Sequence, residues 1–247
     1  MVGLSGAAAA WHDVENGAYR ADLPLWRELA EAAGGPVLDL GAGTGRVALD
    51  LAARGHHVTA VDSDPELVDE LRARAERLAA DGTVTAVHGD VRELDLGRLP
   101  HSLAIAPAQL MQILGGTEAR RQALRGVARH LEEGGIFAAA VARTLDALPA
   151  DDASPPLPDM LERDGWVLQS QPLSVRREGA QVVVARRRQA VSPAGALEVE
   201  SVELTLEVLS PGQLEREARD AGLAPSGRRT VPESGDHIGS EVVLCRR

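Results

Sequence analysis

The sequence predicts an α/β protein whose core is a doubly wound, mostly parallel β-sheet. An apolar segment at 37–40 runs into a glycine-rich turn at 41–45, and a helical segment follows at 47–54. A second apolar segment then ends on Asp62, which gives the first half of a nucleotide-binding βαβ unit. Glycines suit this turn because the backbone must reverse tightly and let a ligand lie against it.

The spacing of the glycines separates two classes of cofactor. A dinucleotide-binding turn has Gly or Ala three residues after its second glycine, but this chain has Arg46 there. The pattern is instead Asp39-x-Gly41-x-Gly43-x-Gly45. A carboxylate before the first glycine would repel a pyrophosphate and suits a cationic ligand. An NAD(P)-dependent oxidoreductase is therefore the less favoured alternative.

This arrangement resembles motif I of the class I S-adenosylmethionine-dependent methyltransferases, whose cofactor carries a sulfonium and an ammonium group. The resemblance implies a Rossmann-like seven-stranded, mostly parallel sheet with a reversed last strand. It also implies that the glycine turn lies against the amino acid and ribose of the cofactor, that Asp62 holds the ribose, and that Asp90 and Val91 meet the adenine. The implied cofactor-binding residues are Asp39, Gly41, Gly43, Gly45, Asp62, Ser63, Asp90, Val91 and Pro107.

The other elements follow in the order that such a sheet requires. After a flexible start at 1–10, helical segments are expected at 11–33, 65–80, 117–131 and 211–221. Strands are expected at 83–88, 102–106, 136–142, 227–231 and 241–246. Asp64 and Ser210 are the expected N-caps of two helices, because each precedes a proline at the first helical position. The first helical segment, 11–33, forms an N-terminal cap in which Pro24 starts or breaks a helix.

An antiparallel β insertion is predicted between the fifth strand and the last helix. The proline-rich, acidic residues 145–164 read as a connector or a mobile flap. Three β-like segments follow within 166–209, and the apolar alternation of the third changes phase at Ser201, which predicts a bulge or a strand that changes sheets. The run 186–188 of three arginines could bind an acidic group of a substrate. The favoured expectation is that Arg186 and Arg188 lie on a solvated face and pair with acids of the next strand, namely Glu198, Glu200 and Glu203. The family uses such insertions either as a lid over the acceptor or as a homodimer surface.

The candidates for catalysis lie outside the glycine turn. By resemblance, the segment before the first strand folds over the cofactor, which makes His12 and Tyr19 pocket candidates; alternatively, Tyr19 anchors the terminus by packing. Gln109 follows the end of the fourth strand, and His237 lies in the polar turn before the last strand. Residues 106–109 lack the acid and the aromatic residue of methyltransferases that act on nucleobase amino groups, so a nucleobase acceptor is disfavoured.

Composition narrows the classes of partner. Acidic residues outnumber basic ones 37 to 26 in 247 residues, a formal charge of -11 that argues against nucleic acid or an anionic membrane as the main partner. The single cysteine excludes an intrachain disulfide framework, and no signal peptide, membrane span or metal-ligand spacing is recognisable, so a cytoplasmic protein is expected. We expect one methyltransferase domain, 1–247, that uses S-adenosylmethionine on a small-molecule O or N acceptor. The alternative is a module that binds this cofactor without catalysis.

Overall fold

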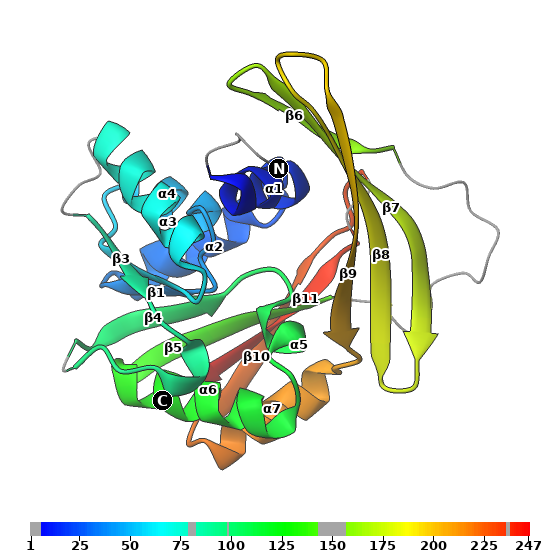
Figure 1. The fold of residues 1–247 in the computed structure, drawn as a ribbon. Helices are drawn as coiled ribbons and strands as arrows, with labels where there is room; N and C mark the ends of the chain where they lie inside the picture. The colour runs from blue at the N-terminus through cyan, green and yellow to red at the C-terminus, as the bar shows by residue number, and fades with distance from the viewer. Residues whose placement is uncertain (1–5, 79–82, 98, 143–156, 236–237) are drawn as a thin grey trace.

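The protein contains two β-sheets, of which the larger has seven strands (Figure 1). The computed structural model describes residues 6–78, 83–97, 99–142, 157–235 and 238–247. The strand order is β10-β11-β5-β4-β1-β2-β3. The strands are β1 (Val37–Leu40), β2 (Val58–Asp62), β3 (Val84–His88), β4 (His101–Ala106), β5 (Leu131–Ala142), β10 (Ala224–Val231) and β11 (Ser240–Arg246). The strand β11 is antiparallel to both β5 and β10, which confirms the predicted reversed last strand.

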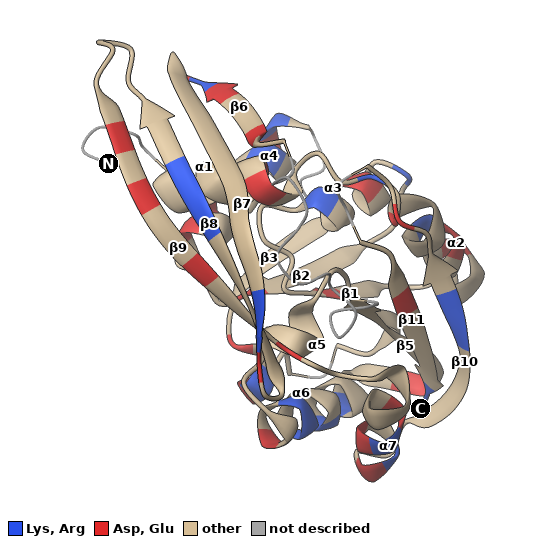
Figure 2. Ribbon diagram, turned by 90° about the vertical axis from the view of Figure 1, so that its right-hand side faces the viewer, with Lys and Arg blue, Asp and Glu red and all other residues tan. Residues whose placement is uncertain are grey.

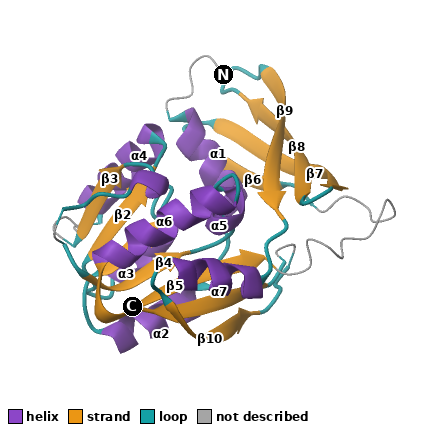
Figure 3. Cartoon of the chain, turned by 90° about the horizontal axis from the view of Figure 1, so that it is seen from below, coloured by secondary structure: helices purple, strands orange, loops and turns teal. Residues whose placement is uncertain are grey.

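Helices cover both faces of this sheet (Figure 3). One face carries α2 (Leu23–Ala33), α3 (Arg46–Ala52) and α4 (Pro65–Arg77). The other carries α5 (Leu110–Ile113), α6 (Thr117–His130), α7 (Pro211–Asp220) and the short 3₁₀ helix η1 (Val91–Glu93). Successive strand residues alternate between the two cores, so that Val37 packs toward the first set of helices and Leu38 toward the second. This alternation confirms the doubly wound fold.

The two predicted helix starts are confirmed. The Asp64 side chain accepts hydrogen bonds from the backbone N–H groups of Glu66 and Leu67, and Pro65 follows as the first residue of α4. Ser210 likewise accepts from the Gln213 N–H, with Pro211 first in α7. Each side chain satisfies backbone donors that a helix leaves free at its N-terminus.

The second sheet is the predicted antiparallel insertion, and its strand order is β6-β7-β8-β9. Its strands are β6 (Asp159–Arg163), β7 (Trp166–Glu178), β8 (Gln181–Val191) and β9 (Leu197–Glu207). The sequence prediction missed β6 and placed its residues in the connector. The hairpin from β6 to β7 turns at Asp164 and Gly165, both with positive φ, which is the Asp-Gly signal of a tight hairpin.

The predicted irregularity at Ser201 is wrong. The strands β8 and β9 pair without interruption, and the irregular pairing lies in β7, between Pro172 and Ser174. Without a bulge, Val199 and Leu206 point to opposite faces of β9: Val199 is 56% exposed and Leu206 is buried. The change of phase in the sequence therefore reflects apolar residues on both faces of β9. Neither face of this strand is buried along its whole length, so its apolar residues are not confined to one face.

The N-terminal segment differs from the prediction in one respect. Helix α1 (Ala7–Asn16) includes alanines that were assigned to a flexible start, and α2 is a separate helix. Ala9 and Ala10 are fully buried, and the Ala8 N–H donates to Glu66 Oε1 over 2.6 Å. The small alanine side chains allow α1 to pack closely against its neighbours. The sequence prediction had interpreted the same alanines as part of a flexible start.

Helix α1 lies between α4 and the second sheet (Figure 1). Trp11 and Val14 pack on Trp166 and Leu168 of β7. The basic positions of β8 lie beside the acidic positions of β9 (Figure 2), but the predicted partners of these arginines are wrong. Their partners lie elsewhere: Arg188 pairs with Glu15 of α1 over 2.8 Å, and Arg186 pairs with Asp159 of β6. The inner face of the second sheet is thus directed at α1 and not at solvent.

Within the described residues, no helix is long and apolar enough to cross a membrane. The same ranges contain no group of three or more His, Cys, Asp and Glu side chains placed to hold a metal ion.

Candidate cofactor site

The glycine turn has a backbone that only glycine adopts easily. Gly41, Gly43 and Gly45 have φ angles of 65°, 56° and 92°. A Cβ on Gly43 would lie 2.3 Å from His12 Nε2, and one on Gly45 would lie 2.2 Å from Leu71 Cδ1. The three glycines therefore serve both the reversal of the chain and the close approach of its neighbours, including α1.

The Asp62 carboxylate fastens this turn to the end of β2. Its Oδ2 accepts from the Gly43 N–H over 2.8 Å, and its Oδ1 accepts from the Asp64 N–H over 3.0 Å. An ionised carboxylate has about four acceptor positions, so two backbone donors leave room for a pair of hydroxyl groups. Binding of the ribose by Asp62 stays a prediction, and its placement beside the glycine turn supports it.

Asp39 is a buried carboxylate that makes no well-formed hydrogen bond. The residue is 1% exposed, and neither oxygen accepts a well-formed hydrogen bond. Burial raises the pKa of Asp39 to about 7, although the nearby Arg46 guanidinium favours the charged form. A buried acid without a partner is unfavourable unless it is neutralised or meets a cation. The site therefore fits a cofactor that carries a sulfonium and an ammonium group.

This pKa predicts that the affinity for S-adenosylmethionine depends on pH. A cation favours the ionised form of Asp39, so binding below pH 7 must also release a proton. We expect the affinity to fall about tenfold for each pH unit below 7 and to level off above it. Calorimetry from pH 5.5 to 8.5 should show this slope in the wild type and in the control Asp69→Asn, an exposed acid of α4, but not in Asp39→Asn. A flat wild-type profile would contradict the assignment.

The predicted adenine-binding residues lie at the carboxyl end of β3. Asp90 caps η1 by accepting from the Arg92 N–H over 2.8 Å, and it also accepts from Arg92 Nε over 2.9 Å. The hydrogen bond from Arg92 lowers the pKa of Asp90, and Val91 is buried beside it. Ser63 is exposed just beyond β2, and Pro107 is buried just beyond β4. The four residues share one edge of the sheet, while their contacts with the cofactor stay predictions.

The residues of other helices that hold the glycine turn in place were not predicted from the sequence. Thr44 Oγ1 donates to Asp13 of α1 over 2.7 Å, and Asp13 pairs with Arg74 of α4. Arg46 makes two hydrogen bonds to the buried Asp22, over 2.6 and 2.7 Å. The sequence did contain an indication of the contact between Arg46 and Asp22. A basic residue in the first turn of a helix is unfavourable beside the positive end of the helix dipole, so Arg46 suggests an acidic partner.

The structure separates the four candidates for catalysis. His12 lies on the glycine turn, with Nδ1 3.2 Å from Thr44 Oγ1. The Tyr19 ring lies under Arg46, 5.1 Å from Cζ to the ring centroid, and packs on the core beneath α2 and α3, which favours the anchoring role. Gln109 is the half-buried residue before α5. His237 lies outside the described residues.

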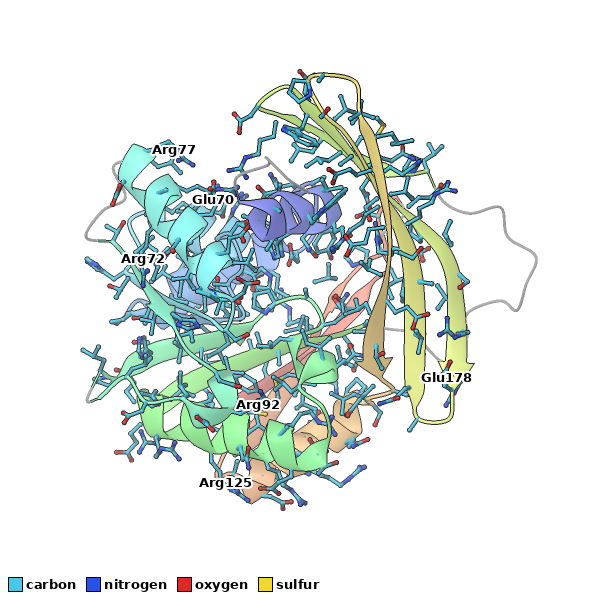
Figure 4. All side chains as sticks on the ribbon, viewed as in Figure 1. Glu70, Arg72, Arg77, Arg92, Arg125 and Glu178 are labelled. Atoms are coloured by element: carbon cyan, nitrogen blue, oxygen red, sulfur yellow. The ribbon has the colours of Figure 1, made fainter. Side chains whose placement is uncertain are left out.

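A chain of ion pairs connects this site to the second sheet. Glu70, on the side of α4 that faces α1 (Figure 4), pairs with Arg74 over 2.8 Å and with Arg163 of β6 over 3.0 Å. Arg74 in turn holds Asp13, the partner of Thr44. The glycine turn, α1, α4 and the second sheet therefore form one connected set of charges.

Residues 37–135, which run from β1 into the start of β5, match the family model described as a methyltransferase domain. This match agrees with the strand order, the three glycines and Asp62. Residues 37–135 are thus a methyltransferase domain, and the fold is that of the class I S-adenosylmethionine-dependent methyltransferases, whose cofactor is S-adenosylmethionine. The nicotinamide-dependent alternative is set aside.

Three known proteins illustrate the similarity. The CcbJ methyltransferase from Streptomyces caelestis is 25% identical, with a TM-score of 0.71 over 92% of this chain and 90% of that one. The sugar N-methyltransferase KedS8 from Streptoalloteichus sp ATCC 53650 is 18% identical and shares the fold, with a TM-score of 0.76 over 98% and 93%. The S-adenosyl-L-methionine-dependent Diels-Alderase iccD from Talaromyces variabilis is 32% identical over 152 residues, 60% of this chain and 50% of that protein. The chain spans half or less of the curated relatives it matches first.

Proposed function

We propose that the protein transfers the methyl group of S-adenosylmethionine to an oxygen or nitrogen atom of a small molecule. The observation that carries this proposal is the buried, unpartnered Asp39 carboxylate beside a glycine turn that Asp62 fixes in place. When bound, the cofactor supplies an activated methyl group on its sulfonium. The acceptor would reach it from the carboxyl edge of the sheet, where ligands of open α/β folds bind.

The residues of the chain would act mainly by positioning. Asp62 would orient the ribose, and α1 would cover the amino acid part of the cofactor. Orientation of this kind is worth roughly 7 to 11 kcal/mol in a two-reactant step, so a covalent nucleophile is not required.

We favour the lid role for the second sheet. Its inner face packs on α1 through Trp166 and Leu168, and Arg188 ties it to Glu15. These contacts attach the sheet to the helix that lies on the glycine turn. A homodimer through the outer face stays a prediction, as does a cytoplasmic location.

The name of one relative favours a second candidate function. The iccD protein is called a Diels-Alderase that depends on S-adenosyl-L-methionine, a name that describes a different reaction. The alternative for this chain is accordingly a protein that binds the cofactor without transferring its methyl group.

One experiment separates the candidates. The protein is titrated by calorimetry with S-adenosylmethionine and S-adenosylhomocysteine, then incubated with S-adenosylmethionine and a panel of amino sugars, amines, phenols and alcohols. We expect both ligands to bind, and S-adenosylhomocysteine to appear in equal amount with a methylated product. Binding without any product in the whole panel would favour the second candidate. Heat with NAD and none with either sulfur ligand would contradict both.

A further inference from the structure

The imidazole of His12 lies directly on the glycine turn. An ideal Cβ built on Gly43 would be 2.3 Å from His12 Nε2 and 2.4 Å from Cε1, closer than real side chains approach one another. Only glycine at position 43 therefore leaves room for this ring. The Nε2 edge of the imidazole therefore lies against Gly43, in the turn that the resemblance places against the cofactor.

A hydrogen-bond chain determines which ring nitrogen carries the hydrogen. Asp13 is paired with Arg74, so its carboxylate can only accept. The Thr44 hydroxyl donates its one hydrogen to Asp13 Oδ1 over 2.7 Å. Toward His12 Nδ1, 3.2 Å away, the same hydroxyl can then only accept. The hydrogen of this contact must come from the imidazole, so His12 is protonated at Nδ1.

The environment of His12 keeps the imidazole neutral. Burial lowers the pKa of His12, and the nearby Arg74 lowers it further. The carboxylates of Asp13, Asp62 and Glu15 act in the opposite direction without cancelling the effect of burial. A neutral ring with hydrogen on Nδ1 has a free lone pair on Nε2. None of the described residues donates a hydrogen bond to that nitrogen.

We propose that His12 Nε2 accepts a hydrogen bond from the bound cofactor, and that Thr44 and Asp13 are positioning residues that hold the ring in this tautomer. The inference rests on the proposed function, because it takes S-adenosylmethionine as the ligand. The cofactor offers two kinds of donor near the glycine turn, its ammonium group and its ribose hydroxyls. A neutral acceptor suits this ligand, since an imidazolium would repel the sulfonium.

The tautomer can be tested on the free protein. Nitrogen-15 NMR of the histidine rings at pH 7.5 should show His12 protonated at Nδ1 and unprotonated at Nε2. Thr44→Ser keeps the hydroxyl and should keep this pattern, whereas Thr44→Val removes it and should give a mixture of tautomers. Hydrogen on Nε2 in the wild type would overturn the proposal. An unchanged tautomer in Thr44→Val would remove the positioning role of Thr44. Both readouts are independent of whether the protein transfers methyl groups.

The contact with the cofactor is tested by a matched pair of variants. The amide of His12→Asn reaches only the position of Nδ1, whereas that of His12→Gln reaches the position of Nε2. We expect His12→Asn to bind S-adenosylhomocysteine about tenfold more weakly, the effect of one lost hydrogen bond, and His12→Gln to stay within about threefold. Equal affinity of His12→Asn and wild type would refute the contact.

A second ligand identifies the donor. 5′-Methylthioadenosine keeps the ribose and lacks the amino acid part. A loss confined to S-adenosylhomocysteine would assign the hydrogen bond to the ammonium group, and a loss with both ligands would assign it to a ribose hydroxyl. If wild type binds neither S-adenosylmethionine nor S-adenosylhomocysteine, the proposed function itself fails, while the NMR result still reports on the tautomer.

Discussion

Replacing Asp62 with alanine is expected to weaken binding of S-adenosylhomocysteine by about a hundredfold or more. Two hydrogen bonds from ribose hydroxyls to a charged acceptor would be lost, each worth roughly 1.5 to 3 kcal/mol. The Gly43 N–H would lose its partner as well, because it donates to Asp62 Oδ2 over 2.8 Å, so the glycine turn would be less well ordered for any ligand. Titration calorimetry with S-adenosylhomocysteine measures this effect without turnover.

Two controls separate the ribose contact from loss of the turn. Asp69→Ala removes an exposed acid of α4 and should leave the affinity unchanged. The second control replaces the ligand: 2′,3′-dideoxy S-adenosylhomocysteine should bind wild type weakly and should lose little further affinity in Asp62→Ala. If Asp62→Ala binds the normal ligand within threefold of wild type, the ribose assignment is wrong and Asp62 serves only to fix Gly43.

The parts of the site that sequence reasoning could predict are those that the local chain determines. Gly41, Gly43 and Gly45 all have positive φ, and Asp62 follows at the end of the next strand. Strand, turn, helix and strand are consecutive in this unit, so spacing along the chain translates directly into distance in space. The reversed β11 followed from the resemblance for a similar reason, because the order of elements restricts the topology.

The support around the turn could not be predicted in this way. Thr44 and Asp13 are 31 residues apart, and Asp13 and Arg74 are 61 apart. Their contact depends on where α1 packs, and that placement is determined by buried alanines and by Trp11 against the second sheet. Neither feature has a period or a motif that a single sequence reveals.

The errors in the second sheet have a common physical cause. Strand prediction relies on one buried face, which imposes a period of two on apolar residues. The strand β9 has exposed apolar residues on both faces and only Leu206 buried, and β6 is only partly buried along its length. Because neither strand has one continuous buried face, the pattern of apolar residues did not predict which side chains of β6 and β9 point inward.

Replacing Arg120 with methionine is expected to lower the free energy of unfolding by about 3 to 5 kcal/mol, because it breaks a buried ion pair from one side. Arg120 is 2% exposed, and its Nε and Nη2 donate to the two Glu217 oxygens over 2.7 and 3.0 Å. It also pairs with Glu207, the last residue of β9, so one guanidinium joins α6, α7 and the second sheet. Urea unfolding of the whole chain measures the loss.

The reason for this loss can be tested with a double variant. In Arg120→Met the Glu217 carboxylate stays buried without its partner, whereas Arg120→Met/Glu217→Leu removes both charges and should recover most of the lost stability. The exposed pair of Arg125 and Glu118 on α6 is the matched control, and Arg125→Met should cost less than about 1 kcal/mol. If the double variant is as unstable as the single one, the stability comes from the attachment of β9 through Glu207 and not from neutralising Glu217. The second sheet would then be held to the α/β domain by this arginine, and its loss should also weaken cofactor binding through α1.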